Sequence, residues 1–242
     1  MLMPITLYRE APTHPQAQAC QACAVRRDAL FGALDEQGLH QLHTHIEAPS
    51  FAADAPIFGE GRRGASMLTI RAGVVRFERV TAQGERRIVR LAGRGDLIGQ
   101  EALLGQPYAE DAVAATEVEV CRLPVGLVDE LGQTQRGVTQ ELMRRWQRAL
   151  AEAQTWSMDI TTGSAPRRLL HLLLRLQALA GHDGLAWLPR REEMADMADL
   201  RTETVSRWIS RWRREGWVEP LPPRHARLHS DGLRQALDAL DD

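Results

Sequence analysis

Three polar residues near the end of the chain have the spacing needed to contact one short stretch of DNA. Glu203, Ser206 and Arg207 lie three and four residues apart, so in a helix they share one face near its N-terminus. Arginine can bond guanine O6 and N7 together, glutamate can accept from cytosine N4, and serine suits either kind of base. The segment therefore predicts a helix that reads base edges in a major groove.

The same segment carries enough positive charge to follow a phosphate backbone. Residues 201–214 contain five arginines and one glutamate. We expect the DNA-contacting set to be Arg201, Thr202, Glu203, Ser206, Arg207 and Arg211. The alternative is an amphipathic helix with a solvated basic face, because helix-turn-helix patterns are short and permissive.

The three cysteines form a second group that can do chemistry. Cys20 and Cys23 are separated by two residues, and Cys121 lies far along the chain. Two thiolates at the first spacing can bind one metal ion or cluster, or can act as a redox dithiol. Cys121 ends a predicted strand, where a cysteine commonly serves as a small apolar side chain. From the residues alone, a cluster, a zinc site, thiol redox chemistry and simple packing all stay open.

Two short helices joined by a tight turn position the DNA-contacting residues. Pro189 suits the first turn of the first helix, and Met194 and Met197 give that helix a buried stripe. Asp199 suits the turn because aspartate tolerates the left-handed conformation. The second helix covers about 202–214 and buries four apolar residues at helical spacing, Val205, Trp208, Ile209 and Trp212.

This motif belongs to a C-terminal domain that we expect over residues 162–242. A helix with a leucine-rich face is predicted over 167–179, before the motif. After the motif, residues 217–228 form a β-hairpin wing with the proline-rich run 220–223 at its tip, and a helix over 230–240 closes the domain.

Between residues 46 and 126 the pattern changes to short apolar segments separated by glycine-containing turns. The expected strands cover residues 57–58, 67–70, 74–80, 87–91 and 118–123. Closely spaced strands with glycine turns predict an antiparallel sandwich or barrel. A jelly-roll body of this kind encloses a ligand or serves as a rigid frame. Residues 1–45, which carry Cys20 and Cys23, form a separate N-terminal segment with a short helix.

A long helix is predicted over residues 127–161, between the two domains. Its second half carries an apolar stripe made of Leu142, Trp146, Ala149, Leu150, Ala153, Trp156 and Ile160. Without Leu150, which widens the stripe, the steps alternate between four and three residues, as in a two-helix seam. We expect the helix to pair with its copy in a homodimer, and a helix packed on its own domain is the simpler alternative. A homodimer would present two recognition helices to a two-fold symmetric site.

Length and charge restrict the class of protein. The chain has 242 residues and a net charge of −2, so any affinity for nucleic acid must come from a local patch. No apolar run reaches the ~20 residues of a membrane span, and residues 1–18 lack the layout of a secretory signal. We expect a cytoplasmic protein with no membrane partner, in which three cysteines do not form a disulfide framework.

The accumulated pattern resembles the Crp/Fnr family of bacterial transcription regulators, and within it the Fnr branch. The matching runs in the strand region are FGEG at 58–61, IRAGVVR at 70–76, GERRIV at 84–89 and GRGDLIG at 93–99, followed by ETVSR at 203–207. The resemblance implies an α+β fold with an N-terminal cyclic-nucleotide-binding-like β-roll (jelly roll), a long dimerisation helix and a C-terminal winged helix-turn-helix.

The resemblance also implies an operator and a polymerase contact. The E-x-x-S-R pattern is similar to the Fnr-type reading head, which favours TTGAT, a spacer of four base pairs and ATCAA. Arg207 is expected to bond guanine, Glu203 to contact the opposite strand and Ser206 to help select thymine. The cAMP-receptor branch differs, with Arg where this chain has Thr202 and Gly at the position of Ser206. The turn over residues 83–85 is expected to touch RNA polymerase.

Oxygen-sensing members of the branch hold a [4Fe–4S] cluster with four cysteines. Cys20, Cys23 and Cys121 match three of them, and Ala29 stands at the fourth position. We expect a three-cysteine cluster whose fourth ligand is Asp28, His14 or an exogenous molecule. An acidic residue of that branch that opposes dimerisation is replaced here by Ala153, which favours association. The alternatives without a cluster are zinc, thiol redox sensing and a constitutive regulator.

Other ligands and activities find less support in the residues. Cyclic-nucleotide binders of the superfamily hold the phosphate with an Arg-Ser pair, whereas this chain has Glu110 and Asp111 in that region, so no cyclic nucleotide is expected. A small molecule or haem in the β-roll is the rival hypothesis, suggested by three histidines, His40, His43 and His45. An enzyme is the weakest alternative because no nucleophile–base motif, phosphate loop or paired-carboxylate frame is present.

Overall fold

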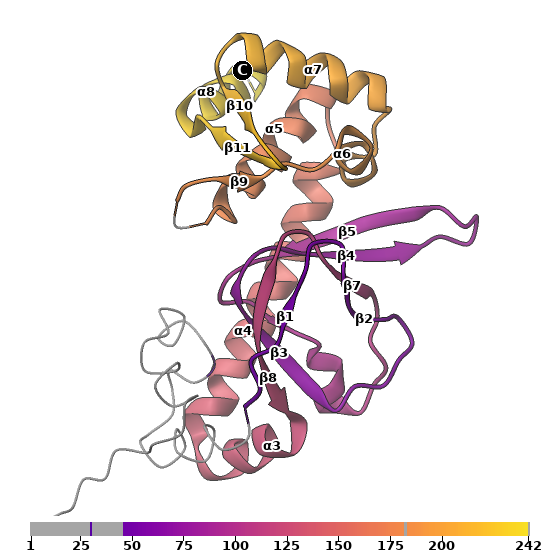
Figure 1. Cartoon of the computed structure of the whole chain (residues 1–242), viewed down its shortest axis with the longest axis vertical. Helices are drawn as coiled ribbons and strands as arrows, with labels where there is room; N and C mark the ends of the chain where they lie inside the picture. The colour runs from indigo at the N-terminus through magenta and orange to yellow at the C-terminus, as the bar shows by residue number, and fades with distance from the viewer. Residues whose placement is uncertain (1–29, 31–45, 182, 242) are drawn as a thin grey trace, which may run out of the picture.

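The structure is a computed structural model that describes Leu30 and residues 46–181 and 183–241. A β-roll is followed by helices that run along it and by a C-terminal domain at one end of the molecule (Figure 1). The expected α+β class, with a β-roll, a helical connection and a winged helix-turn-helix, is confirmed. Cys20, Cys23 and the three histidines of the rival hypothesis lie outside the described residues.

Two four-stranded antiparallel sheets form the β-roll, one in the order β1-β8-β3-β6 and the other in the order β2-β7-β4-β5. The strands are β1 (Ser50–Phe51), β2 (Pro56–Phe58), β3 (Ser66–Ala72), β4 (Val75–Val80), β5 (Arg86–Ala92), β6 (Leu97–Ile98), β7 (Asp111–Ala114) and β8 (Val118–Pro124), with a 3-10 helix over Gln100–Leu104. Ile70, Phe77 and Val120 are fully buried between the sheets. Burial of these apolar faces holds the sheets together.

Glycine is required at the turn between β3 and β4. Gly73 has a φ of 88°, and a Cβ atom there would lie 2.1 Å from the carbonyl oxygen of Glu117. Any other residue would clash with the backbone of the β7–β8 turn. The turn therefore brings two distant parts of the β-roll into close contact.

The five strands expected from apolar segments are present as β2, β3, β4, β5 and β8. The sequence pattern gave no signal for β1 and β6, of two residues each, or for β7, of four. Segments this short show too little alternation to be recognised, and their pairing depends on neighbouring strands.

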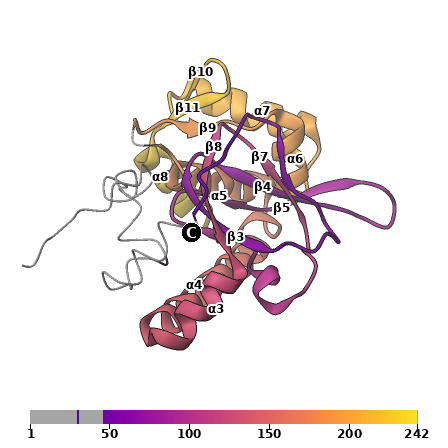
Figure 2. The same cartoon turned by 60° about the horizontal axis from the view of Figure 1, so that its bottom comes forward.

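The predicted helix over 127–161 is divided into several parts. Helix α3 (Val125–Thr134) ends at Gln135, whose φ of −127° and ψ of 100° are extended, and α4 (Arg136–Thr155) begins directly after it. A π-helical turn over Trp156–Ile160 follows α4. Helices α3 and α4 extend away from the C-terminal domain (Figure 2). Among the described residues, no helix has the length and hydropathy required to cross a membrane.

The C-terminal domain has the elements expected from the sequence. Its elements are α5 (Ala165–Ala178), β9 (Ala186–Trp187), α6 (Arg191–Ala198), α7 (Thr202–Arg214), β10 (Val218–Leu221), β11 (His225–Leu228) and α8 (Ser230–Asp241), and its sheet has the order β10-β11-β9. The predicted wing is the β10–β11 hairpin, with the proline run at its tip. Only β9 was not expected.

One apolar cluster crosses from the β-roll into the C-terminal domain. Val74, Ile88 and Leu91 of the β-roll belong to the same buried cluster as Trp156 of the π-helical turn and the leucines of α5. Gly93 lies so close to α5 that a Cβ there would be 2.6 Å from Cδ2 of Leu179. The β-roll and the first helix of the C-terminal domain are thus packed directly together.

Candidate nucleic-acid interface and sensor cavity

The helix α7 has one buried face and one exposed face. Val205, Ile209 and Trp212 are at most 2% exposed, whereas Glu203 and Arg207 are exposed on the opposite side. The buried side packs against the cluster that also holds α5 and α6. Packing on one side therefore fixes the direction in which the polar residues of α7 point.

Three of the predicted DNA-contacting residues are available for a ligand. Arg201, Glu203 and Arg207 form no side-chain hydrogen bond or ion pair with any residue in the described part of the chain. Thr202 and Ser206 are half-buried on the same N-terminal part of the helix. The structure thus brings together the donors and acceptors that suit base edges.

The sixth predicted residue, Arg211, is partly engaged within the helix. Its Nε lies 2.8 Å from Oε1 of Glu215, and its guanidinium stacks 5.3 Å from the ring centroid of Trp208. Trp208 was expected to be buried but is only half-buried, with its ring 5.6 Å from that of Trp212. It lies at the edge of the apolar stripe, where the ring supports the arginine.

A hydrogen bond from the backbone to a glutamate side chain sets the start of α6. Oε2 of Glu193 accepts a hydrogen bond of 2.6 Å from the backbone N–H of Arg190, and the helix begins at the next residue. The expectation that Pro189 lies in the first turn is therefore wrong, because this cap fixes the boundary two residues later. Asp199 ends α6 in the left-handed conformation, at φ 51° and ψ 54°, as the sequence predicted.

Two arginines beside the exposed face of α7 were not among the six predicted DNA-contacting residues. Burial, followed by the nearby charge of Arg213, lowers the pKa of Arg191. Arg191 begins α6 and Arg213 lies near the end of α7, so the crossing of the two helices brings these like charges together. A phosphate group would relieve their repulsion.

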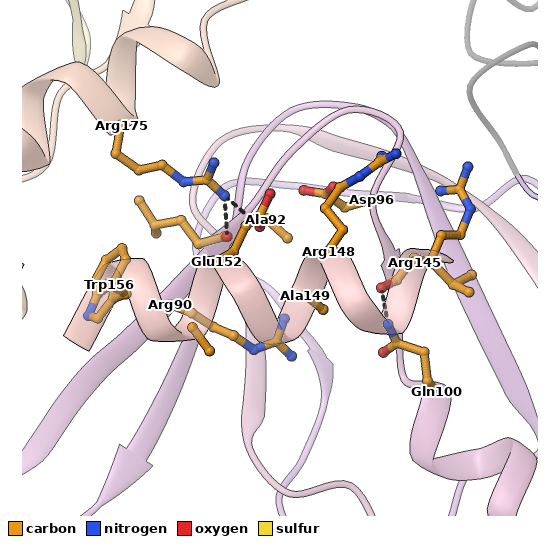
Figure 3. Close-up of a pocket in the computed structure, with 13 residues that line it drawn as sticks. Arg90, Ala92, Asp96, Gln100, Arg145, Arg148, Ala149, Glu152, Trp156 and Arg175 are labelled. Atoms are coloured by element: carbon orange, nitrogen blue, oxygen red, sulfur yellow. Dashed lines mark hydrogen bonds and ion pairs between the residues drawn. The ribbon is translucent and has the colours of Figure 1, made fainter. Parts of the chain in front are cut away.

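A cavity of about 40 Å³ lies between β5, β6, α4 and α5 (Figure 3). Four arginines from three elements contribute to its lining, Arg90, Arg145, Arg148 and Arg175. A buried water needs about 10–15 Å³ on this scale, so the space suits about three waters or one oxyanion. The cavity joins the β-roll, the helix α4 and the C-terminal domain.

Carboxylates offset most of the charge around this cavity. Nε of Arg90 lies 2.7 Å from Oε2 of Glu110, and Nη2 of Arg175 lies 2.9 Å from Oε2 of Glu152. Arg145, which is 5% exposed, donates to the carbonyl oxygen of Gly95 at 2.6 Å. Burial is the main cause that lowers the pKa of Arg145, and the charge of Arg148 adds to it.

Comparison with known proteins follows the two-domain order seen in the structure. The family model of the cyclic nucleotide-binding domain matches residues 49–135, and the family model of the Crp-like helix-turn-helix domain matches residues 167–235. The chain belongs to the Crp/Fnr family of transcription regulators. It is therefore a DNA-binding regulator of transcription, and family membership supports the expectation that it is not an enzyme.

Curated relatives cover most of this Crp/Fnr regulator. The nitrogen fixation regulation protein FixK of Bradyrhizobium diazoefficiens is 28% identical over 211 residues, which cover 84% of this chain and 87% of the relative. The fumarate and nitrate reduction regulatory protein of Vibrio cholerae is 26% identical over 203 residues, which cover 81% and 80%. The Fnr-like resemblance thus extends over both domains.

Solved structures share the fold. FixK2 from Bradyrhizobium japonicum has a TM-score of 0.70 at 24% identity, and the match covers 81% of this chain and 98% of that one. A Crp/Fnr-family regulator from Thermus thermophilus has a TM-score of 0.63 at 27% identity, and the match covers 80% and 100%.

In this Crp/Fnr regulator, the region that holds a cyclic-nucleotide phosphate in other members has a different arrangement of charge. Glu110 pairs with Arg90, whose guanidinium also lies 3.4 Å from the ring centroid of Phe77. Oδ1 of Asp111 accepts a hydrogen bond of 2.7 Å from the backbone N–H of Glu60. Both carboxylates are thus satisfied by groups of the β-roll itself.

Cys121 is the one predicted metal ligand within the described residues. It lies in the middle of β8, paired with Thr69 of β3, rather than at the end of the strand as predicted. Its side chain is 8% exposed and shares an apolar cluster with Leu30 and Leu123. Within the described part of the chain, no group of three metal-ligating side chains is found.

The predicted dimer seam divides into buried and exposed residues. Leu142, Trp156 and Ile160 are at most 8% exposed because the β-roll and α5 already cover that edge of the stripe. Leu150 is 61% exposed, Ala149 and Ala153 are exposed, and Trp146 is half-buried. Met143 adds another exposed side chain, at 62%. The apolar surface left for a partner therefore lies on the outer side of α4.

Proposed function

We propose that this Crp/Fnr regulator binds DNA as a homodimer and recognises a palindrome of the form TTGAT, four base pairs, ATCAA. The observation that carries the proposal is that one chain exposes two different surfaces, one polar and one apolar. The N-terminal part of α7 presents Glu203 and Arg207 without intramolecular partners among the described residues, and α4 presents an apolar stripe to solvent. A dimer formed through the second surface would place two copies of the first on one duplex.

The outer side of α4 has the properties of a helix–helix contact. Met143 and Leu150 are seven residues apart, so they lie on one stripe, and both are more than 60% exposed. The small exposed residues Ala149 and Ala153 beside them would let a second helix approach closely. Ala153 also places no charge in the contact, which favours association.

Substitution within the stripe tests the homodimer. Leu150→Glu should convert a dimer to a monomer in size-exclusion chromatography with light scattering, because two carboxylates would face each other in the contact. Leu240→Glu, at a 45% exposed position on α8, is the matched control and should leave the mass unchanged. A wild-type monomer at micromolar concentration would contradict the proposal.

The reading roles of the residues on α7 follow from their chemistry. Arg207 would bond the guanine of the half-site, Glu203 would accept from the opposite strand, and Ser206 would help to select thymine. Arg201, Thr202 and Arg211 would support the complex near the backbone, together with Arg191 and Arg213. Fluorescence anisotropy should show tighter binding to the TTGAT palindrome than to one whose guanines are replaced, at one salt concentration.

We propose further that the protein responds to oxygen or redox state through a [4Fe–4S] cluster held by Cys20, Cys23 and Cys121. Leu30, seven residues after Cys23, packs in the same cluster as Cys121. Seven residues span at most about 24 Å, which supports a common site for the three thiolates. They fit a cubane in part, since one iron needs another ligand, for which Asp28 is a candidate. When bound, such a cluster supplies sensitivity to oxygen.

Anaerobic purification tests the cluster without relying on DNA binding. The visible and EPR spectra of the wild type should show a cluster with about four irons per chain, and Cys121→Ser should lose it. Thr69→Ser, which alters the buried strand partner of Cys121 but keeps the thiolates, is the control. Colourless, iron-free protein would count against the proposal and would favour the thiol or zinc alternatives.

We also propose that the β4–β5 turn contacts RNA polymerase. This turn protrudes from the β-roll (Figure 1), and residues 83–85 are exposed. Glu85→Ala should reduce transcription in a purified system at a saturated promoter and leave DNA binding unchanged.

The arginine-lined cavity favours a second candidate, a regulator gated by a small anion. Arg148 forms no hydrogen bond or ion pair with another described residue, while Arg145 shares the single carboxylate of Glu141 with Arg144. Inorganic phosphate should then raise the melting temperature, and Arg148→Ala should abolish that effect, whereas Arg144→Ala, outside the cavity lining, should not. No effect of phosphate on the wild type would eliminate this candidate.

A further inference from the structure

Two arginines contact the turn of the helix-turn-helix, Arg87 of the β-roll and Arg168 of α5, whose Nη1 donates to the carbonyl oxygens of Ala198 and Asp199 at 3.1 Å. Nη1 of Arg87, on β5, lies 2.7 Å from Oδ1 of Asp199 and 3.4 Å from the carbonyl oxygen of Asp196. Asp199 is the left-handed residue that ends α6 and sets the direction of α7. The hydrogen bond to Asp199 raises the pKa of Arg87, so the guanidinium stays charged at all ordinary pH values.

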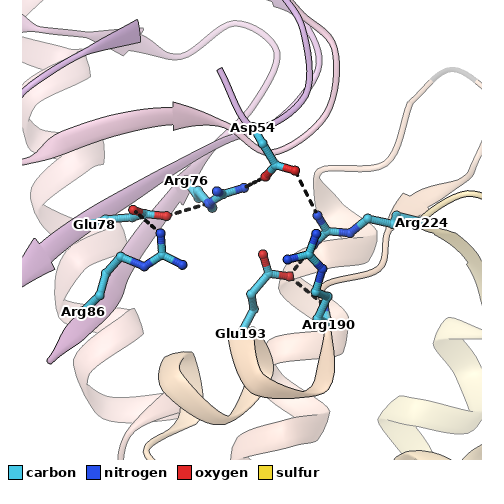
Figure 4. A network of polar contacts seen from close by, with 7 residues as sticks. All are labelled: Asp54, Arg76, Glu78, Arg86, Arg190, Glu193 and Arg224. Atoms are coloured by element: carbon cyan, nitrogen blue, oxygen red, sulfur yellow. Dashed lines mark hydrogen bonds and ion pairs between the residues drawn. The ribbon is translucent and has the colours of Figure 1, made fainter. Parts of the chain in front are cut away.

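A second group of charges joins the wing and α6 to the β-roll (Figure 4). Arg224, in the turn directly before the wing strand β11, binds Glu193 of α6, and its Nη1 lies 3.8 Å from Oδ2 of Asp54. Asp54 in turn accepts a hydrogen bond of 2.7 Å from Arg76 of β4.

The β-roll end of this network is itself braced. Nε of Arg76 lies 2.6 Å from Oε1 of Glu78, and Arg86 lies 3.2 Å from the other carboxylate oxygen of Glu78. Arg76 and Glu78 are each about 5% exposed, so their positions are fixed by the sheet. The wing is therefore connected to a rigid part of the β-roll.

These ionic contacts and the apolar cluster act at different places. The apolar cluster joins α5, α6, α7 and the π-helical turn to residues of the β-roll, whereas the ionic contacts involve the turn after α6 and the wing. Apolar burial is not directional, whereas hydrogen bonds between charged groups require a particular geometry. The ionic contacts thus add a directional constraint on the angle of α7 relative to α4, beyond what apolar burial provides.

We infer that Arg87 and Arg224 are positioning residues that set the spacer the protein accepts between two half-sites. The inference rests on the proposed homodimer and its palindrome. In such a dimer, the angle between α7 and α4 determines the separation of the two reading heads. One added base pair rotates a half-site by about 35° and shifts it along the duplex, so a rigid connection accepts one spacer.

Because the Arg87–Asp199 pair is exposed, its removal should change the orientation of α7 without a large change in the free energy of unfolding. The side chains are 36% and 59% exposed, and exposed pairs contribute little to the free energy of unfolding. A loosened connection would lower the fraction of molecules in the competent orientation, which reduces affinity for the preferred duplex. It would also let other spacers bind.

The test measures affinity for TTGAT palindromes with spacers of two to six base pairs, and for a duplex with one half-site. The wild type should prefer four base pairs over three or five by about tenfold. Arg87→Ala and Asp199→Asn should each reduce that preference to about threefold or less. Binding to the single half-site should not change, because the reading residues remain in place.

Asparagine keeps the left-handed turn, since it adopts that conformation as readily as aspartate. The double variant should therefore resemble either single variant, which shows that the two residues act through one contact. Arg79→Ala is the control, because Arg79 lies on the same hairpin and, among the described residues, its one ion pair is with Glu60, at 3.9 Å. Arg224→Ala should also relax the spacer preference.

Two negative outcomes have different meanings. A wild type that binds the single half-site but gains nothing from any palindrome would overturn the proposed homodimeric recognition, and this inference with it. A wild type that selects one spacer, together with Arg87→Ala and Asp199→Asn variants that select it equally well, would overturn this inference alone.

Discussion

The two sides of the helix-turn-helix use arginine in different ways. On the outer side, Arg201 and Arg207 have no intramolecular partner among the described residues. On the side that faces the β-roll, Arg87 pairs with Asp199 and Arg224 pairs with Glu193. The residue type is the same, but only the second group finds carboxylates from other elements within reach.

The difference is consistent with the two proposed roles, DNA recognition by the outer arginines and placement of α7 by the inner ones. A guanidinium without a partner can give all its donors to a base or phosphate. A guanidinium that bridges two elements has used those donors to fix their relative position. Four substitutions test this comparison, beginning with the largest expected effect.

Removal of a carboxylate on the β-roll side should affect folding. Glu193→Ala leaves the half-buried Arg224 and the backbone N–H of Arg190 without their acceptor. We expect a loss of about 3 kcal/mol in the free energy of unfolding, measured by urea denaturation. Glu192→Ala, at the exposed neighbouring position, should cost less than about 0.5 kcal/mol. Equal losses of unfolding free energy in the two variants would show that the contacts of Glu193 with Arg224 and Arg190 do not stabilise the fold.

Removal of an arginine on the outer side should affect DNA binding and not folding. Arg207→Ala should cost about 1–3 kcal/mol of binding free energy and relax specificity at one base pair. Its unfolding free energy should stay within about 0.5 kcal/mol of the wild type, because the side chain is exposed. Arg234→Ala, on the exposed face of α8, is the binding control. A large loss of stability in Arg207→Ala would contradict the comparison.

The smallest effect should be a difference in pH dependence between two carboxylates of the inner side. Burial raises the pKa of Asp196, so the contribution of this group to stability is full below pH 3.8 and is lost as the pH rises through the raised value. Asp196→Asn should therefore be more stable than the wild type at pH 7, on the order of 0.5 kcal/mol. Urea denaturation at several pH values should show that the stability difference between the variant and the wild type becomes smaller towards pH 4.

For Asp54 the expected pH dependence of stability has the opposite sign. The hydrogen bond from Arg76 lowers the pKa of Asp54, so its contribution is present above pH 3.8 and is lost as the pH falls through the lowered value. Asp54→Asn should accordingly be less stable than the wild type at pH 7. If both asparagine variants shifted stability in the same direction, the assigned causes would be wrong.

Much of the reading motif could be predicted from the sequence because its signals are local. The buried positions of Met194, Met197, Val205 and Ile209 follow the helical period, and all are at most 1% exposed. The left-handed turn at Asp199 follows from the residue type. The predicted start of α6 was wrong because the boundary depends on the side chain of Glu193, which accepts a hydrogen bond from the backbone N–H of Arg190 before the helix.

The exposure of the residues in the predicted dimer seam could be predicted only in part. The periodicity identified which residues of α4 lie on one side, but not which of them the same chain would cover. Trp156 and Leu150 belong to one predicted stripe, yet they are 8% and 61% exposed. Burial depends on the β-roll and α5, which lie far from Leu150 in sequence and cover one edge of the helix.

The order of β-roll, helices and winged helix-turn-helix, and the polar residues that α7 exposes, could be predicted from the amino-acid sequence alone. These properties depend on periodicity, turn residues and side-chain chemistry over short stretches. Only the tertiary structure decided which charges remain available. Arg87 and Asp199 are 112 positions apart, and ion pairs form over distances of a few ångströms. Their pairing therefore exists only once the β-roll and the C-terminal domain have packed together.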